Sequence, residues 1–123
     1  MLTFLKLGYK GNLGNQLFQI ASTIGLANKY GHEFCFPKWE YAKYFDFDFK
    51  EIEDKKGWET LNEVHFNYYE WEIPRGDYSL NGWLQSEKYF QRINIKSVFN
   101  FKTDFETSLI NQNRKLFSKS TLL

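Results

Sequence analysis

A glycine-rich stretch near the N-terminus constrains the fold of this chain more than any other part of its sequence. Residues 2–7 are mostly apolar, and glycines then follow at every third position: Gly8, Gly11 and Gly14. Residues 15–30 carry one apolar helical face, formed by Leu17, Ile20, Ala21, Ile24 and Ala27. A strand, a glycine loop and a helix in this order form the half-unit that brings α/β backbones close to a ligand. The stretch predicts an α/β fold with a strand at 2–7 and a helix at 15–30 that ends at Gly31.

The rest of the chain carries weaker secondary-structure signals. Residues 33–36 form an apolar run closed by Pro37, which predicts a second strand and completes a parallel βαβ unit. We expect the first strand to be central in the sheet. The remaining expectations are a packed loop with short helical turns at 38–57, segments that could be strands at 45–49 and 64–71, a strand at 78–84, a short helix capped by Ser86, and a final helix at 103–117.

Length and charge limit the classes of function. The 123 residues suffice for one domain with a modest core, and 16 basic residues balance 15 acidic ones. This balance argues against electrostatic capture of nucleic acid or of an anionic membrane. No apolar run approaches the ~20 residues of a membrane span and no secretory signal is evident, so we expect a cytoplasmic protein. The single cysteine, Cys35, fits a reducing compartment, and its apolar neighbours predict a buried thiol.

The spacing of the glycines does not by itself identify a ligand. The loop differs from the dinucleotide-binding pattern G-x-G-x-x-G, and no Gly-Lys-Ser/Thr sequence closes it as in a P-loop. The spacing suits a ligand loop and a tight structural turn equally. Asn15 and Gln16 place two amides, each both donor and acceptor, at the mouth of the loop. The aromatic content, 20% of the chain, is expected mainly in the core but also suits the stacking of sugar rings.

Two blocks of sequence resemble a known enzyme family. The first, Gly11-Asn12-Leu13-Gly14-Asn15-Gln16-Leu17-Phe18-Gln19-Ile20-Ala21, is similar to the N-terminal signature of the family 11 glycosyltransferases, the α-1,2-fucosyltransferases. The second, Leu80-Asn81-Gly82-Trp83-Leu84-Gln85-Ser86-Glu87-Lys88-Tyr89-Phe90, is similar to that family's Gly-Tyr/Trp-x-Gln-Ser-x-x-Tyr-Phe block. The resemblance implies the Rossmann-like N-terminal lobe of a GT-B type glycosyltransferase, with residues 1–123 as one lobe. It also implies transfer of fucose from GDP-fucose to a galactoside hydroxyl in glycan synthesis, without a metal or other cofactor.

The resemblance indicates candidate substrate-binding residues but no catalytic one. They are Gly11, Asn12, Gly14, Asn15, Gln16 and Gln85. We expect Asn15 and Gln16 to bind acceptor hydroxyls or the donor; the alternative is that both only fix the glycine loop through backbone contacts. We further expect Gly14 to need a positive φ, and Trp83 to pack beside the first helix. Glu87 lies inside the second block and is a residue to examine, whereas a structural role is expected for His65.

One element of the family is missing from the chain. The family's donor-binding run, His-x-Arg-Arg-x-Asp, pairs an arginine with the diphosphate of GDP-fucose, and no such run occurs here. Arg75-Gly76-Asp77 matches only its last letters and precedes the second block, so we expect a turn there. We therefore expect an N-terminal lobe that stops before the donor-binding lobe and is inactive alone.

Two alternatives to a transferase lobe stay open. One is a non-catalytic carbohydrate-binding or interaction module, and the other is a lobe with no independent activity. The partners that the resemblance implies are a sugar nucleotide and a glycan acceptor, with no nucleic acid. Lipid-linked or surface glycan acceptors would also allow peripheral association with a membrane.

Overall fold

In the computed structural model, which describes residues 1–53 and 57–102, three parallel strands form a sheet in the order β1-β3-β2. The strands are β1 (Leu2–Thr3), β2 (Glu59–Asn62) and β3 (Tyr78–Asn81). In the parallel register, Tyr78 of β3 lies opposite both Leu2 and Glu59. The α/β class and the parallel sheet predicted from the sequence are therefore confirmed. The helix expected at 103–117 lies outside the described residues.

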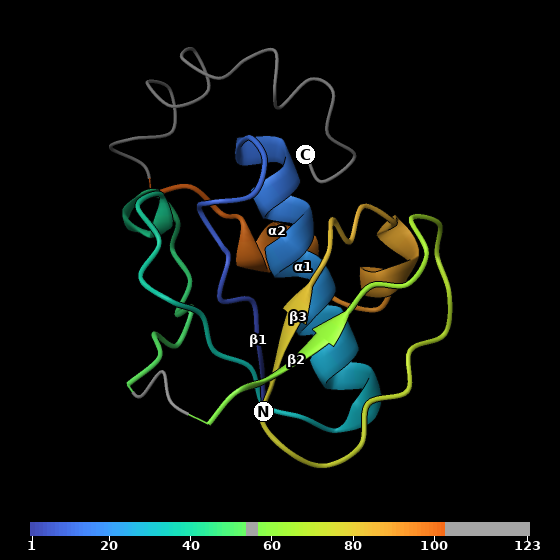
Figure 1. The fold of residues 1–123 in the computed structure, drawn as a ribbon. Helices are drawn as coiled ribbons and strands as arrows, with labels where there is room; N and C mark the ends of the chain where they lie inside the picture. Colours follow the sequence, from blue (N-terminus) through green and yellow to red (C-terminus); the bar gives the residue numbers. More distant parts are fainter. Residues whose placement is uncertain (54–56, 103–123) are drawn as a thin grey trace.

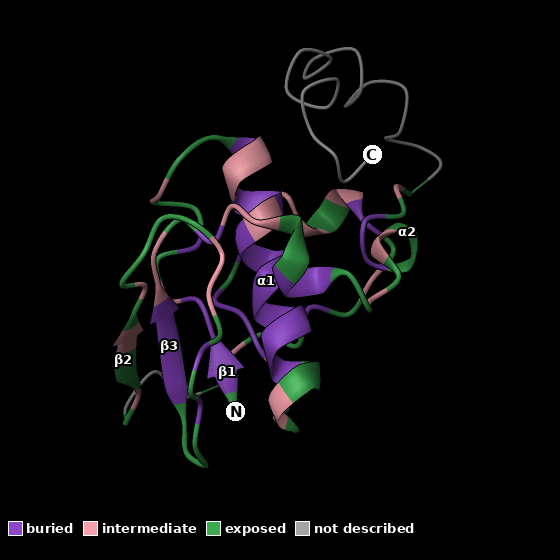
Figure 2. Cartoon of the chain, turned by 90° about the vertical axis from the view of Figure 1, so that its right-hand side faces the viewer, coloured by how far each residue is buried: buried purple, intermediate pink, exposed green. Residues whose placement is uncertain are grey.

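The position of β1 differs from the expectation that the first strand is central. β3 is the central strand of the three, and its residues 78–80 are buried (Figure 2). On the side of β1 that faces away from β3, the predicted strand 33–36 pairs with it through an isolated parallel bridge between Leu2 and Phe34. Backbone hydrogen bonds from Leu2 N to Glu33 O (2.8 Å) and from Cys35 N to Leu2 O (3.0 Å) hold this bridge. The segment stays short because Pro37 follows directly and has no N–H to extend the ladder.

Helix α1 (Leu13–Tyr30) covers one face of the sheet (Figure 2). It begins at Leu13 rather than at residue 15, because Asn12 and Asn15 form a reciprocal cap at its start. Gly31 ends it in the left-handed conformation (φ 73°) and donates its N–H to Ala27 O. Every residue of the predicted core face is buried: Leu17, Ile20, Ala21, Ile24 and Ala27. The predicted helix and its buried face are confirmed.

Trp83 is not a core residue, contrary to the prediction that it packs with the buried face of α1. Its side chain is 39% exposed, and Lys10 Nζ lies 5.0 Å from the centre of its ring. Leu84, which is fully buried, supplies the core contact instead. β3 ends at Asn81, before the predicted residue 84. Gly82 follows it and packs so closely against Glu63 that an added Cβ would lie 2.4 Å from the Glu63 Cβ.

The other elements are short. They are η1 (Ala42–Tyr44), η2 (Glu87–Phe90) and α2 (Ile95–Val98). Ser86 caps η2 as predicted, since its hydroxyl accepts the Lys88 N–H at 3.3 Å. Residues 64–71 are not a strand: Val64 and Phe66 are each 70% exposed, and only Trp71, at 5% exposed, lies in the core. Among the described helices, none combines the length and the apolar character that a membrane crossing requires.

Candidate functional site

The carboxyl edge of the sheet between β1 and β3 is the candidate binding site. After β1 the chain passes through α1 to residues 33–36 on one side of β1, whereas β3 lies on the other side. α1 runs back along the sheet, so its N-terminus lies at the carboxyl ends of the strands (Figure 1). In open α/β sheets, ligands bind where the strand order reverses, outside the carboxyl ends of the strands. The glycine loop of the first sequence block and the loop after β3 in the second block both lie at this edge.

The position of Gly11 in the loop requires a glycine, whereas the position of Gly14 does not. Gly11 has a φ of +85°, and a Cβ added to it would lie 2.7 Å from the Cβ of Asn15. Gly14 does not have a positive φ, and an added Cβ would meet only Asn12 Oδ1, at 3.4 Å. The expectation for Gly14 is wrong because α1 begins at Leu13 and takes Gly14 into its first turn.

Asn15 joins the two sequence blocks. Its backbone N donates to Asn12 Oδ1 (3.0 Å), and Asn12 N donates to Asn15 Oδ1 (3.1 Å), which closes the helix cap. The remaining amide atom, Asn15 Nδ2, donates to Gln85 Oε1 at 3.0 Å. Gln85 Nε2 in turn donates to the backbone oxygens of Asn15 (3.3 Å) and Trp83. This amide pair brings together residues that are 70 positions apart in the chain.

Gln16 points into the protein. It is 5% exposed; its Nε2 donates to Gly11 O at 3.1 Å, and its Oε1 accepts the Trp39 Nε1–H at 2.8 Å. Gln19 holds the same loop by donating from Nε2 to Lys10 O (3.0 Å). These contacts tie the glycine loop to the core. They are the contacts expected if Asn15 and Gln16 only fix the loop. Contact of the half-buried Asn15 or of Gln16 with substrate stays a prediction.

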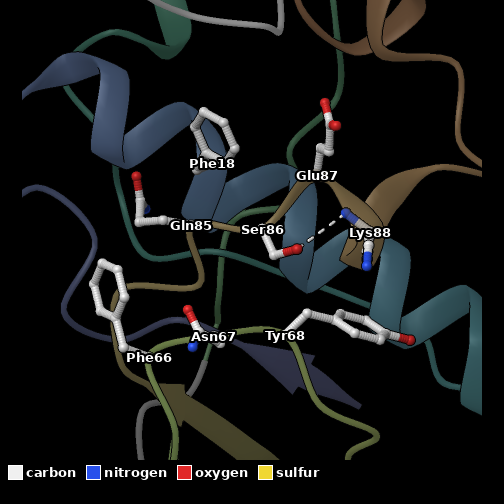
Figure 3. A pocket seen from close by; sticks show the side chains of 8 residues that line it. All are labelled: Phe18, Phe66, Asn67, Tyr68, Gln85, Ser86, Glu87 and Lys88. Carbon is white, nitrogen blue, oxygen red and sulfur yellow. Dashed lines mark hydrogen bonds between the residues drawn. The ribbon is translucent and has the colours of Figure 1, made fainter.

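A pocket of about 470 Å³ opens beside Gln85 (Figure 3). It lies between residues 66–68, which follow β2, and residues 85–88, which follow β3, with Phe18 of α1 also in its wall. Its volume falls within the range of small-molecule sites. Asn67 and Glu87 line it and are exposed, and neither side chain has a hydrogen-bond partner among the described residues. The sequence singled out Gln85 and Glu87, but nothing in it indicated that Phe66 and Asn67 come to the same place.

Glu63 is a further residue of this edge that sequence reasoning missed. Its Oε1 accepts the Trp83 N–H at 3.0 Å, while its Oε2 is buried without a hydrogen-bond partner among the described residues. Burial raises the pKa of the Glu63 carboxyl above its ordinary value of 4.5, against the backbone N–H groups of Trp83 and Leu84 and the charge of Lys10, which lower it. Residues 59–62 carry no clear strand pattern, so the sequence does not predict that Glu63 lies at this edge.

The raised pKa of Glu63 predicts a pH-dependent contribution to stability. The unfolded chain releases this proton near pH 4.5, whereas the folded protein retains it to higher pH. The contribution of Glu63 to stability is therefore largest below pH 4.5 and is lost as pH rises through the raised pKa. We expect Glu63→Gln to gain stability relative to the native chain as pH rises from 4 to 7, measured by urea unfolding. Glu59→Gln, which alters an exposed carboxylate of β2, is the control, and parallel pH profiles for Glu63→Gln and the native chain would contradict the prediction.

Cys35 and His65 offer little chemistry at this edge. Cys35 is buried, as expected, and burial raises the pKa of its thiol. The His65 ring is exposed and packs edge-on against Tyr69, with 5.4 Å between the ring centres. Within residues 1–53 and 57–102, no group of three or more His, Cys, Asp or Glu side chains could hold a metal ion.

Comparison of the chain with protein-family models, with curated proteins and with solved structures returned no match in any of the three. The contacts at the carboxyl edge and the two sequence blocks are therefore what bears on function.

Proposed function

We propose that this chain is the acceptor-binding, Rossmann-like lobe of a GT-B type glycosyltransferase of the α-1,2-fucosyltransferase kind. The observation that carries the proposal is the amide pair between Asn15 and Gln85 at the carboxyl edge of the sheet. The two residues belong to the two blocks that resemble the family. Two blocks that matched by chance would have no reason to meet at the edge where α/β proteins bind ligands.

The proposed reaction is an inverting transfer. An acceptor sugar hydroxyl attacks the anomeric carbon of GDP-fucose, the bond from that carbon to the diphosphate oxygen breaks, and GDP leaves while the hydroxyl proton passes to a base. This chain would hold the acceptor at the carboxyl edge, and Asn12, Asn15, Gln16 and Gln85 would keep the edge in shape. Stabilising the departing diphosphate needs strong donors, and arginine can supply them without a metal. The His-x-Arg-Arg-x-Asp run that does this in the family is not among the 123 residues.

A non-catalytic carbohydrate-binding module is the second candidate. One observation favours it: the side chains of Asn15 and Gln16 are bonded to protein groups. Such a module would bind the same sugars at the same edge but would not need GDP-fucose. Binding of the donor therefore separates the two candidates.

We expect the 123-residue chain alone to bind a β-galactoside and to show no measurable fucose transfer. Loss of one strong donor to a developing oxyanion costs about 3–4 kcal/mol in the transition state, and here the matching arginine is missing altogether. The assay combines purified chain, GDP-fucose and lactose, and follows released GDP and fucosylated product.

A parallel NMR titration measures the binding of lactose and of GDP-fucose to the same preparation. Transfer that appears only when the chain is extended by a segment with the arginine run would support the lobe assignment. Robust turnover by the chain alone would contradict the expected inactivity, and no binding of lactose would overturn both candidate functions.

A further inference from the structure

The pocket beside Gln85 combines aromatic faces with free polar groups. Phe66 is 70% exposed at its rim, and Phe18 and Tyr68 also line it. Figure 3 shows the side chains of Gln85 and Ser86 between the rings of Phe18 above and Phe66 and Tyr68 below. Asn67 and Glu87 offer an amide and a carboxylate that have no partner among the described residues. Apolar ring faces next to such groups match a pyranose, which has an apolar face and a rim of hydroxyls.

A second, more enclosed pocket of about 320 Å³ adjoins the first. The two share Tyr68 and Lys88 in their walls, and Lys88 Nζ lies 5.5 Å from the centre of the Tyr68 ring. The second pocket continues along α1, with Gly25 and Lys29, towards Arg92 beyond η2. The two pockets therefore lie next to each other, with the Lys88–Tyr68 contact in the wall between them. Together they are called the groove below, with a Phe66 compartment and an Arg92 compartment.

The second compartment carries an excess of positive charge. Lys29, Lys88 and Arg92 line it against one carboxylate, Glu70. Glu70 is already engaged, because Lys29 donates to its Oε2 and the Tyr68 hydroxyl donates to its Oε1 at 2.9 Å. Neither Lys88 nor Arg92 has an ion-pair partner in the described part of the chain. An exposed guanidinium with no partner is suited to bidentate contact with a carboxylate or a phosphate.

We propose that this groove binds an acidic glycan, with a sugar ring in the Phe66 compartment and its neighbouring acidic group in the Arg92 compartment. The proposal rests on the proposed function, because it names the kind of acceptor that the same edge would take. The acidic group is a carboxylate, as in a sialylated sugar, or a phosphate ester, since both match the guanidinium. Phe66 would determine the binding of the ring, and Arg92 would determine the preference for a charged sugar.

Binding of matched sugars to the complete 123-residue chain tests this. The probes are lactose, 3′-sialyllactose, galactose and galactose 6-phosphate, titrated at low salt and followed by NMR. We expect each acidic sugar to bind about threefold to tenfold more tightly than its neutral counterpart, lactose or galactose, with the preference falling as salt rises. The carboxylate and phosphate arms show which acidic group the compartment prefers.

Variants with matched controls assign the two compartments. Arg92→Gln should remove the preference for acidic sugars and leave lactose binding unchanged, whereas Arg75→Gln, an exposed arginine outside both pockets, should change neither. Phe66→Ala should weaken the binding of all four sugars, whereas Val64→Ala, equally exposed on the same loop, should not. All four side chains are exposed, so these variants should remain folded.

The outcomes separate this inference from the function on which it rests. Equal affinity for neutral and acidic sugars, or a preference that Arg92→Gln leaves intact, overturns the acidic groove while the acceptor-binding lobe stands. A preference retained in Phe66→Ala with undiminished affinity would also overturn it. Failure of every sugar to bind overturns both proposals.

Discussion

Gly25→Ala is expected to destabilise the protein by about 3 kcal/mol, because an added methyl group would overlap the backbone of another element. A Cβ at Gly25 would lie 2.0 Å from Tyr89 O and 2.8 Å from the Cα of Phe90. Neither atom belongs to a flexible side chain that could move aside. α1 would therefore have to separate from η2, whose Tyr89 and Phe90 are both 5% exposed. Urea unfolding followed by tryptophan fluorescence measures the change.

Gly14→Ala is the matched control in the same helix. Its added Cβ would meet only Asn12 Oδ1 at 3.4 Å, which is ordinary contact. Because alanine favours the helix over glycine, we expect this variant to gain up to about 1 kcal/mol. The opposite signs of the two changes are the test. If Gly25→Ala were as stable as Gly14→Ala, the close approach of α1 to η2 described here would be wrong.

Gln16→Met is expected to cost about 2 kcal/mol by leaving a buried donor without a partner. Trp39 is 5% exposed, and its Nε1–H donates to Gln16 Oε1 at 2.8 Å. Methionine keeps most of the glutamine volume but cannot accept this hydrogen bond well. Gly11, whose backbone oxygen also loses a donor, is exposed and can bind water instead. Chemical denaturation of the variant and the native chain gives the difference in unfolding free energy.

A double-mutant cycle with Trp39→Phe separates the hydrogen bond from packing. Trp39→Phe removes the donor but also reduces contact with Phe45, whose ring stacks on Trp39 with 5.7 Å between ring centres. If the bond matters, the double variant should lose less than the sum of the two single variants, by about 1 kcal/mol. Additive losses, or a Gln16→Met variant as stable as the native chain, would show that Gln16 does not depend on Trp39.

α1 could be predicted almost completely because its determinants are local. At the start of the helix, Asn12 and Asn15 cap each other across one turn. At its end, Gly31 bonds to Ala27, again about one turn away. The buried face of α1 also repeats at helical spacing, which sequence alone displays. The strands were harder to place, because a strand is stabilised by neighbours that are distant in the chain. The alternating residues around Val64 and Phe66 are exposed, whereas Glu59–Asn62 pairs with β3 despite a polar sequence.

The candidate site was likewise only partly predictable from the sequence. The two sequence blocks identified Asn15 and Gln85, but their mutual hydrogen bond appears only when the chain is folded. Glu63 and Phe66 could not be found, because their positions at the carboxyl edge depend on where β2 ends. Trp83 was misplaced for a related reason: its backbone is held by Glu63, and the turn at Gly82 directs Leu84 into the core instead.

The sequence by itself determined the α/β class, the extent of α1 and the loop that begins it, because these depend on periodicity and on contacts between near neighbours. Only the tertiary structure decided which glycines are indispensable. Gly25 is required because Tyr89 approaches from a segment more than sixty positions away, and Gly82 because Glu63, which follows β2, packs against it. A glycine's spacing shows where the chain can bend or approach another element, but the atoms that would meet a side chain there come from the rest of the fold.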